Sequence, residues 1–303
     1  DILTMRGSTP EYVERLAVKD GKIVYAGNRL GIAPYKGAAT ITVDLKGRTL
    51  MPGFIDAHGH IVDYTTSWGN PNLSPPPVSD VSSIKKLVQK LRAFVQKTPP
   101  PSGKIAFASG YDDSLLLEKH HPTRFDLDQV STDHAIAIIH ASGHLVVANS
   151  KALQLAKIGK QTKDPQGGVI QRDPKTGEPN GILEEQAGAM ILPLLNFPSA
   201  QKALATMEAV QDYYASFGIT TAQDGISSPS NVAILKQVSQ NHAAKIDLVS
   251  YPQWTYFNDV LAGTRKLDVD YYPPGYMTSN QGRSSKSSAE KETPAAIGAV
   301  AKQ

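Results

Sequence analysis

The sequence contains no cysteine, no long apolar run and no strong excess of charge of one sign. Without cysteine there are no disulfides, thiolate metal sites or cysteine nucleophiles, so histidine, aspartate and glutamate remain as possible metal ligands. A cysteine-free chain suits the cytosol and the periplasm equally, so the compartment stays open. No apolar run approaches the roughly 20 residues that cross a bilayer, which argues against an integral membrane protein and a membrane partner.

The charge balance gives no sign of a nucleic-acid partner. The 31 Lys and Arg residues stand against 28 Asp and Glu residues, and the net charge of +3 is small and scattered. At 303 residues the chain exceeds a typical domain of about 100 to 200 residues. We therefore expect several structural units or one barrel-sized unit.

The pattern of apolar residues predicts an α/β protein. In residues 1–50, "RLAVKDGKIVYAG" predicts two strands around a Lys-Asp-Gly turn, and "ATITVDLKGRTLMPG" alternates like a further strand. "KIAFASGYD" and "HAIAIIHASGH" are typical of buried strands with functional loops at their carboxyl ends, and residues 164–185 resemble a hairpin.

Two helices are predicted clearly. One follows residue 80, with a buried stripe made of Ile84, Leu87, Val88, Leu91 and Val95. The other begins after Ser199 as N-cap and ends near Gly218, with the stripe Leu204, Met207, Val210, Tyr214 and Phe217. The strand "ITTAQD", a helix near 229–242 and the strand "KIDLVSYPQW" follow, and this alternation predicts a parallel sheet with helical crossovers.

The stretch "MPGFIDAHGH" (51–60) is the first candidate for a metal site. Side chains at i and i+2 of a strand share a face, so we expect His58 and His60 to project side by side at the strand's carboxyl end. Two imidazoles so placed can share one Zn²⁺ at about 2.0 to 2.1 Å. The alternative is a chance His-X-His in a loop.

Several motifs together resemble the amidohydrolase superfamily, in its YtcJ-like branch that includes N-substituted formamide deformylases. The motifs are "LMPGFIDAHGH", "SGYD" (109–112), "HPTRFDLDQVSTDHAIAIIHASGHLVVANSKAL" (121–153), "DPQGGVIQRDPKTGEPNGILEE" (164–185) and "FGITTAQDG" (217–225). They lie in the family's order and cover roughly residues 2–262, as the family's N-terminal half would.

This resemblance implies a metal-dependent hydrolase on a (β/α)8 TIM-type barrel, of which this chain holds only the first strands. The implied divisions are a small β-sandwich part (1–50), the partial barrel (51–60 and 199–262), a large α+β insertion (61–198) and an atypical tail (263–303). His58 and His60 would be metal ligands, His144 and Glu185 of the insertion would face the substrate, and Asp224 would lie at the mouth of the second strand.

The implied chemistry is hydrolysis of a C–N bond in a small amide or formamide substrate. One or two divalent ions, zinc by family, would acidify a water and polarise the carbonyl, while a carboxylate, Asp224 or Glu185, would move the proton. Structural alternatives stand beside two of these roles, since His144 could cap a strand and Glu185 could occupy a solvated first helical turn. The remaining histidines and the Asp112-Asp113 pair are interpreted as structural or exposed: His120, His121, His134, His140 and His242.

The family's later ligands cannot be placed in this chain. Lys266 and "NQGR" (280–283) resemble the family's lysine strand and the following loop too weakly to carry a role, and the only histidine after His144 is His242. Three parallel strands cannot close a barrel, so we expect a truncated product, a fragment or a self-associating chain. The competing hypotheses are a non-catalytic amidohydrolase-like protein with a binding role and a cyclic-amide or D-aminoacyl hydrolase.

Overall fold

The computed structural model describes residues 1–253, 259, 261–264 and 270–272, which form two compact units. One unit holds residues 1–68 and the described residues from 198 onward, and the other holds residues 69–197. Lys266, residues 280–283 and most of the expected tail lie outside the described residues. No helix in the described part of the chain combines the length and apolar character needed to span a bilayer.

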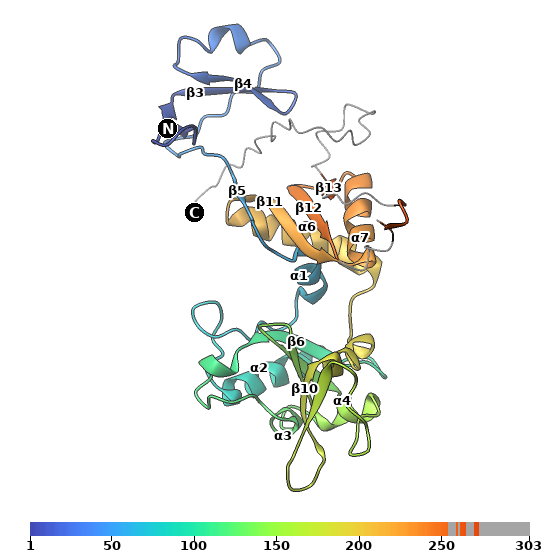
Figure 1. The fold of residues 1–303 in the computed structure, drawn as a ribbon. Coiled ribbons are helices and arrows are strands. Elements are labelled where there is room, and N and C mark those ends of the chain that lie inside the picture. Colours follow the sequence, from blue (N-terminus) through green and yellow to red (C-terminus); the bar gives the residue numbers. More distant parts are fainter. Residues whose placement is uncertain (254–258, 260, 265–269, 273–303) are drawn as a thin grey trace. The chain divides into compact units, whose positions relative to one another are not determined.

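The amino-terminal residues form two small antiparallel pairs (Figure 1). β1 (Ile2–Leu3) pairs with β2 (Tyr12–Val13), and β3 (Arg15–Lys19) forms the expected hairpin with β4 (Lys22–Gly27). Asp20 and Gly21 turn the hairpin with positive φ angles of 52° and 74°, as a tight hairpin turn requires. A short 3₁₀ turn, η1 (Ala33–Tyr35), follows.

No strand forms in the stretch "ATITVDLKGRTLMPG" (39–53), and this prediction was wrong. Ile41 and Val43 are 89% and 75% exposed, and the segment meets a sheet only where Leu50 bridges to Ile2. Alternation of polar and apolar residues predicts a strand only when a partner strand buries the apolar side. Here the apolar side chains have no such cover.

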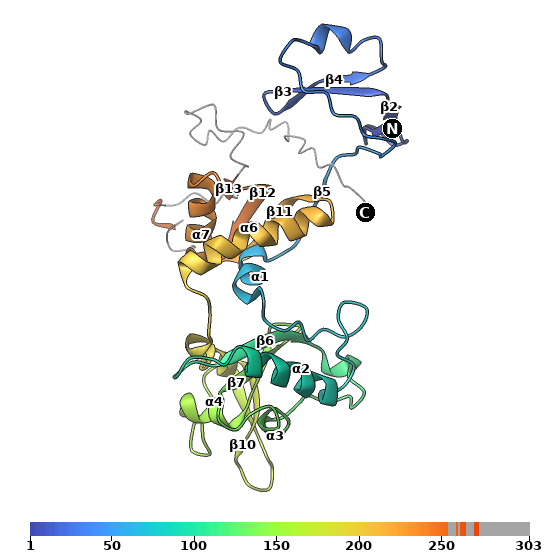
Figure 2. The same ribbon diagram turned by 180° about the vertical axis from the view of Figure 1, so that it is seen from behind.

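The same unit contains a four-stranded sheet in the order β13-β12-β11-β5 (Figures 1 and 2). β5 (Phe54–Ile55), β11 (Ile219–Ser227) and β12 (Asp247–Pro252) are parallel, and β13 (Asp270–Tyr272) adds antiparallel to β12. The predicted parallel α/β pattern is thus confirmed, while the described strands form an open sheet rather than a closed barrel.

Three helices supply the apolar core of this sheet. They are α1 (Ile61–Ser67), α6 (Ala200–Ser216) and α7 (Pro229–Gln240), and Ser199 caps α6 as predicted. Met207 and Val210 of α6 pack with Ala222 of β11 in one buried cluster. Phe217 departs from the predicted stripe, because the helix has ended there and the side chain is 59% exposed.

Residues 69–197 fold around a five-stranded sheet in the order β6-β7-β8-β10-β9. β6 (Ala106–Tyr111) and β7 (Ile136–His140) are parallel, whereas β8 (Leu145–Ala148), β10 (Pro179–Glu185) and β9 (Gly168–Arg172) continue antiparallel. Alternate residues of β6 enter two different apolar clusters, as the period of two in a strand requires. Both faces of this sheet are therefore buried.

Helices and turns connect these strands. α2 (Ile84–Lys97) begins at the N-cap Ser83, and its predicted stripe is buried throughout. The shorter elements are η2 (Asp113–Leu115), α3 (Arg124–Asp128), α4 (Ser150–Leu155), α5 (Gln186–Ala189) and η3 (Leu192–Leu194). Because β6 and β7 are parallel neighbours, the loops that follow these two strands start at the same edge of the sheet.

Candidate functional site

His58 and His60 lie beyond the strand that was expected to carry them. β5 ends at Ile55, and His60 bridges to Asp224 of β11 and forms the N-cap of α1. The two imidazole rings are nevertheless neighbours, with centroids 5.2 Å apart and planes at 86°. A tight turn held against β11, rather than strand periodicity, therefore brings these rings together.

One hydrogen bond determines which nitrogen of His60 is available to a ligand. Nδ1 of His60 lies 2.8 Å from the carbonyl oxygen of Gly225. Because a carbonyl oxygen only accepts, Nδ1 must carry the proton, and Nε2 of the neutral ring keeps its lone pair. A metal-binding histidine usually has its second nitrogen bound in this way.

Two glycines permit the close approach of the chain segments around the histidine pair. A Cβ on Gly59 would lie 2.2 Å from Oδ2 of Asp56, so the side chain of Asp56 occupies that space. A Cβ on Gly225 would lie 3.2 Å from both Cε1 of His60 and the carbonyl oxygen of Gly59. Gln223 adds a hydrogen bond, since its Oε1 accepts from the backbone N–H of Gly59 at 3.1 Å.

Asp224 is fully buried and ties β11 to the start of α1. Its Oδ1 accepts from the backbone N–H of Val62 at 3.0 Å, and its Oδ2 accepts from the hydroxyl of Ser227 at 2.6 Å. The amide of Asn231 approaches the same Oδ2 at 3.4 Å. Burial is the main cause that raises the pKa of this carboxyl group above its ordinary value, while the bond from Ser227 opposes the rise.

No third ligand joins the histidine pair within the described residues. The one group of three or more metal-ligating side chains found there lies in the other unit and consists of Asp112, Asp113 and His140. These three residues were interpreted as structural or exposed, and the structure brings them together. The sequence signal was present, because polar residues follow both β6 and β7, and neighbouring parallel strands end at the same edge.

His144 and Glu185 also belong to the unit of residues 69–197. His144 precedes β8 and Glu185 ends β10, and Nδ1 of His144 lies 3.0 Å from Oε2 of Glu185. Their side chains are 66% and 54% exposed, so both remain accessible to solvent. Glu185 has a φ angle of 48°, in the region that favours glycine, and the short helix α5 follows it.

Comparison with known proteins identifies the family. A family model described as "Amidohydrolase family" matches residues 42–284. The chain is 29% identical over 254 residues to the exoenzymes regulatory protein AepA of Pectobacterium carotovorum subsp. carotovorum, covering 83% of this chain and 53% of that protein. It is 30% identical over 178 residues to the N-substituted formamide deformylase of Arthrobacter pascens, covering 59% of this chain and 32% of that protein.

Solved structures show the same relationship at the level of fold. An uncharacterized metal-dependent hydrolase from Pyrococcus horikoshii OT3 matches with a TM-score of 0.56 and 22% identity, covering 84% of this chain and 47% of that one. The chain thus spans about half or less of the length of these relatives, in agreement with the resemblance to one half of the family. The family match extends over most of the sequence, and the chain belongs to the amidohydrolase family.

Proposed function

We propose that this chain is the first part of a metal-dependent hydrolase that cleaves a C–N bond in a small amide or formamide substrate. The observation that carries the proposal is the histidine pair, with its rings 5.2 Å apart and Nδ1 of His60 bound to the Gly225 carbonyl. Membership of the amidohydrolase family and the similarity to a formamide deformylase support the choice of bond. The three parallel strands would then be the first strands of a (β/α)8 barrel.

The residues at this site fit a divalent ion as part of its coordination. His58 and His60 would hold the ion through imidazole nitrogens, and the hydrogen bond at Nδ1 orients His60 for binding through Nε2. A bound divalent ion such as zinc, alone or as one of two, supplies an acidified water and polarises a carbonyl group. Since catalytic zinc usually has three protein ligands, further ligands would come from outside the described residues.

The other predicted residues have separate parts in this proposal. Asp224 accepts a hydrogen bond from Val62 and so holds the start of α1, where His60 is the N-cap. Its raised pKa suits a group that exchanges a proton. Glu185 and His144 form an exposed acid and base pair, which would bind and orient the polar part of the substrate.

A non-catalytic role is the second candidate. Two observations favour it: only two ligands meet at the histidine pair in the described residues, and the chain covers about half or less of its relatives. Such a chain would keep the family's fold and bind a ligand or partner through residues 69–197. A cyclic-amide or D-aminoacyl hydrolase is a weaker alternative within the hydrolases.

Metal analysis with activity assays tests the proposal. Purified protein without a polyhistidine tag is assayed for bound zinc, manganese and iron and for hydrolysis of N-formyl and N-acyl amines. We expect the double variant H58A/H60A to lose an equivalent of metal and any hydrolysis, whereas His120→Ala, at an exposed histidine outside the pair, keeps both. Equal metal content in the wild type and the double variant would remove the proposed metal site.

A further inference from the structure

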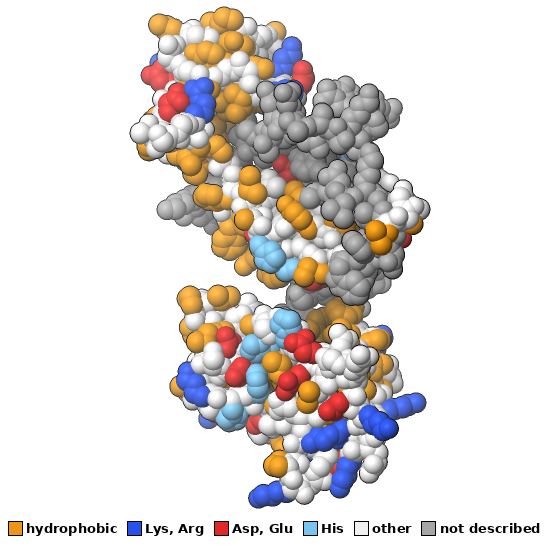
Figure 3. All heavy atoms as spheres, in the orientation of Figure 1, with side chains coloured by type: hydrophobic (Ala, Val, Ile, Leu, Met, Phe, Trp, Pro, Cys, Tyr) orange, Lys and Arg blue, Asp and Glu red, His pale blue; other side chains and the backbone are white. Residues whose placement is uncertain are grey.

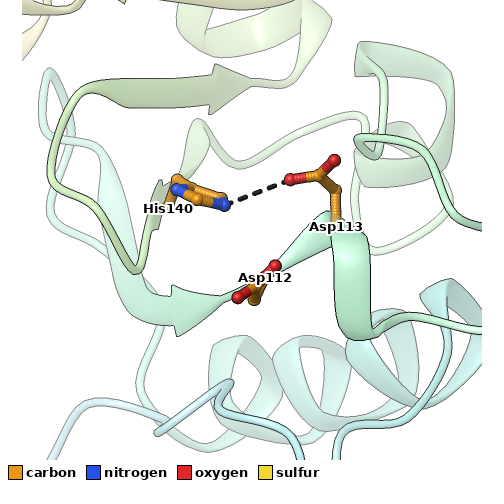
Figure 4. Close-up of side chains that lie close together, drawn as sticks. All are labelled: Asp112, Asp113 and His140. Atoms are coloured by element: carbon orange, nitrogen blue, oxygen red, sulfur yellow. Dashed lines mark ion pairs between the residues drawn. The ribbon is translucent and has the colours of Figure 1, made fainter.

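Four titratable side chains that the proposed hydrolytic site does not use meet at one edge of the sheet in residues 69–197. They are Asp112, Asp113, His121 and His140. Figure 3 shows histidine and acidic side chains gathered on one face of this unit, and Figure 4 shows Asp112, Asp113 and His140 close together. The cluster combines carboxylate oxygens with imidazole nitrogens, which are the donor types of divalent transition metals.

The parallel pairing of β6 and β7 creates this juxtaposition. Tyr111, the last residue of β6, pairs in register with His140, the last residue of β7. Asp112 and Asp113 follow Tyr111 directly, and Asp112 caps η2 by accepting from the backbone N–H of Ser114 at 2.9 Å. The backbone thus holds both carboxylates next to the ring of His140.

The distances are close to those of a coordination sphere. One ligand atom from each of Asp112, Asp113 and His140 lies within 4.8 Å of the others, and Nε2 of His140 lies 3.1 Å from Oδ1 of Asp113. Two ligands of a tetrahedral ion at about 2.0 to 2.2 Å are about 3.3 to 3.6 Å apart. Small side-chain rotations would therefore bring three ligands around one ion.

The strongest indication that a ligand binds here is Nε2 of His140. The His140 side chain is 14% exposed, and its Nε2 is a buried atom with no hydrogen-bond partner in the described residues, although Asp113 is at ion-pair distance. The contact therefore lacks the angles of a hydrogen bond. A buried ring nitrogen without such a partner is costly unless another species occupies the position.

The other nitrogen of His140 has partners for either tautomer. Nδ1 lies 2.8 Å from the hydroxyl of Ser142 and 3.1 Å from its backbone N–H. When Nδ1 donates to the hydroxyl, Nε2 has a free lone pair that can bind a metal. When Nδ1 accepts from the backbone N–H, Nε2 carries the proton and lies beside Asp113 without hydrogen-bond geometry, so a proton is the competing occupant.

His121 contacts both Asp113 and His140 of the cluster. Its Nδ1 lies 3.4 Å from Oδ1 of Asp113 and 3.3 Å from the hydroxyl of Tyr111, and the rings of His121 and His140 are edge to face at 5.6 Å. These contacts restrict the carboxylate of Asp113 and the ring of His140. Hydrogen-bonded neighbours of this kind orient the ligands of a metal.

We propose that Asp112, Asp113 and His140 bind one divalent transition metal of the zinc class, with His121 positioning Asp113. The imidazole ligand favours zinc over calcium or magnesium, which prefer a shell of oxygen atoms. This site lies in the unit of residues 69–197 and is separate from the histidine pair of the proposed hydrolytic site. The bound ion joins the carboxyl ends of β6 and β7.

Zinc titration of the full chain without a polyhistidine tag tests this site, with competition by a chromophoric chelator. The variant H58A/H60A serves as the background, because it removes the other proposed site. We expect this background to bind one equivalent of zinc. Adding His140→Gln or Asp113→Asn, each of which changes a direct ligand, lowers the affinity at least about 100-fold, and adding His121→Gln lowers it about 10-fold to 100-fold. The matched control His120→Gln changes the exposed neighbour of His121 and leaves the affinity unchanged.

Two results would overturn the site. One is a background that binds no zinc, which would leave a proton on Nε2 of His140 as the occupant. The other is an equivalent of zinc that binds with unchanged affinity after His140→Gln and after Asp113→Asn. Circular dichroism spectra of every variant verify folding, and Asp113→Asn keeps the shape of the side chain if His140→Gln disturbs it. The outcome is independent of the hydrolytic site, whose failure would show as equal zinc content in the wild type and the background.

Discussion

The two histidine-containing clusters differ in how the chain assembles them. His58 and His60 are two residues apart and follow one strand, whereas Asp112, Asp113 and His140 come from the ends of two neighbouring parallel strands. The first cluster is visible as a short motif in the sequence. The second appears only when β6 and β7 are placed side by side.

The clusters also differ in chemistry. The histidine pair offers two imidazoles, and the buried carboxylate beside it, Asp224, already accepts hydrogen bonds from Val62 and Ser227. The other cluster offers two partly exposed carboxylates and one imidazole whose Nε2 has no hydrogen-bond partner in the described residues. Ligand residues that are near each other in the sequence therefore indicate where a metal site lies. Only the surrounding hydrogen bonds indicate which of their atoms can bind a metal.

The largest effect that would separate the clusters is stabilisation by zinc. At a free zinc concentration about 100 times the dissociation constant, a single site stabilises the folded state by about 2.7 kcal/mol. We expect this gain for the unit of residues 69–197 in the wild type and in His58→Ala, and the loss of most of it in Asp113→Asn. Calorimetric unfolding with and without zinc measures it. An equal gain in Asp113→Asn would show that zinc stabilises the protein without the carboxylate of Asp113.

The next effect concerns the close contact at the histidine pair. In Gly225→Ala the new Cβ would lie 3.2 Å from Cε1 of His60 and from the carbonyl oxygen of Gly59. Such overpacking typically costs about 1–3 kcal/mol, and it would also displace His60 from the hydrogen bond that orients it. Denaturant unfolding and metal affinity measure the two effects.

Gly37→Ala is the matched control in the same unit. Its Cβ would meet nothing closer than the Thr40 hydroxyl oxygen at 4.0 Å, so we expect no loss of stability or metal affinity. If Gly225→Ala behaved like this control, the close approach of β11 to the histidine turn would have no energetic importance.

A smaller effect follows from the burial of Asp224. Because burial raises its pKa above 3.8, the folded state holds this proton at a higher pH than the unfolded state does. The contribution of protonated Asp224 to the free energy of unfolding is fully present below about pH 3.8. It is lost as the pH rises through the pKa that Asp224 has in the folded state. Asp224→Asn does not titrate, so the stability of the wild type relative to this variant should decline with rising pH.

Denaturant unfolding of both proteins across this pH range measures the difference. A difference that stays constant, or that grows in favour of the wild type with rising pH, would contradict the assigned direction. Ser227→Ala provides a further check, since removing the hydrogen bond to the carboxylate should raise the pKa of Asp224 further and steepen the decline.

The smallest effect is expected at the exposed pair of His144 and Glu185. Both side chains are more than half exposed, and an ion pair of this kind contributes at most about 1 kcal/mol. We therefore expect Glu185→Gln to leave the free energy of unfolding nearly unchanged while lowering any hydrolysis of the amide substrate. Loss of stability with full activity would assign the pair to structure and not to substrate binding.

Much of the local structure was predictable because the signal lies within a few residues. Ser83 and Ser199 each precede a helix with a regular apolar stripe, and both cap it through a hydrogen bond to a backbone N–H. The strand predicted in residues 39–53 does not form, for the opposite reason, since a strand also needs a partner that the local sequence does not specify. Phe217 was misplaced because the helix ended one residue before it.

The site could be predicted only in part. The motif at 51–60 identified His58 and His60, but it gave the wrong reason for their proximity, because the strand ends at Ile55. The meeting of the Asp112-Asp113 pair with His140 was not predicted, since 26 residues lie between Asp113 and His140. Their meeting depends on the register that places Tyr111 opposite His140.

The sequence by itself determined the family, the three longer helices α2, α6 and α7, and the position of the first histidine pair, because these depend on motifs, spacing and periodicity over short distances. The tertiary structure alone decided which atoms are available: it placed the Gly225 carbonyl on Nδ1 of His60 and left Nε2 of His140 buried beside Asp113. The physical reason is that hydrogen bonds and metal ligands act over a few ångströms, and only the packing of strands brings distant residues within that reach.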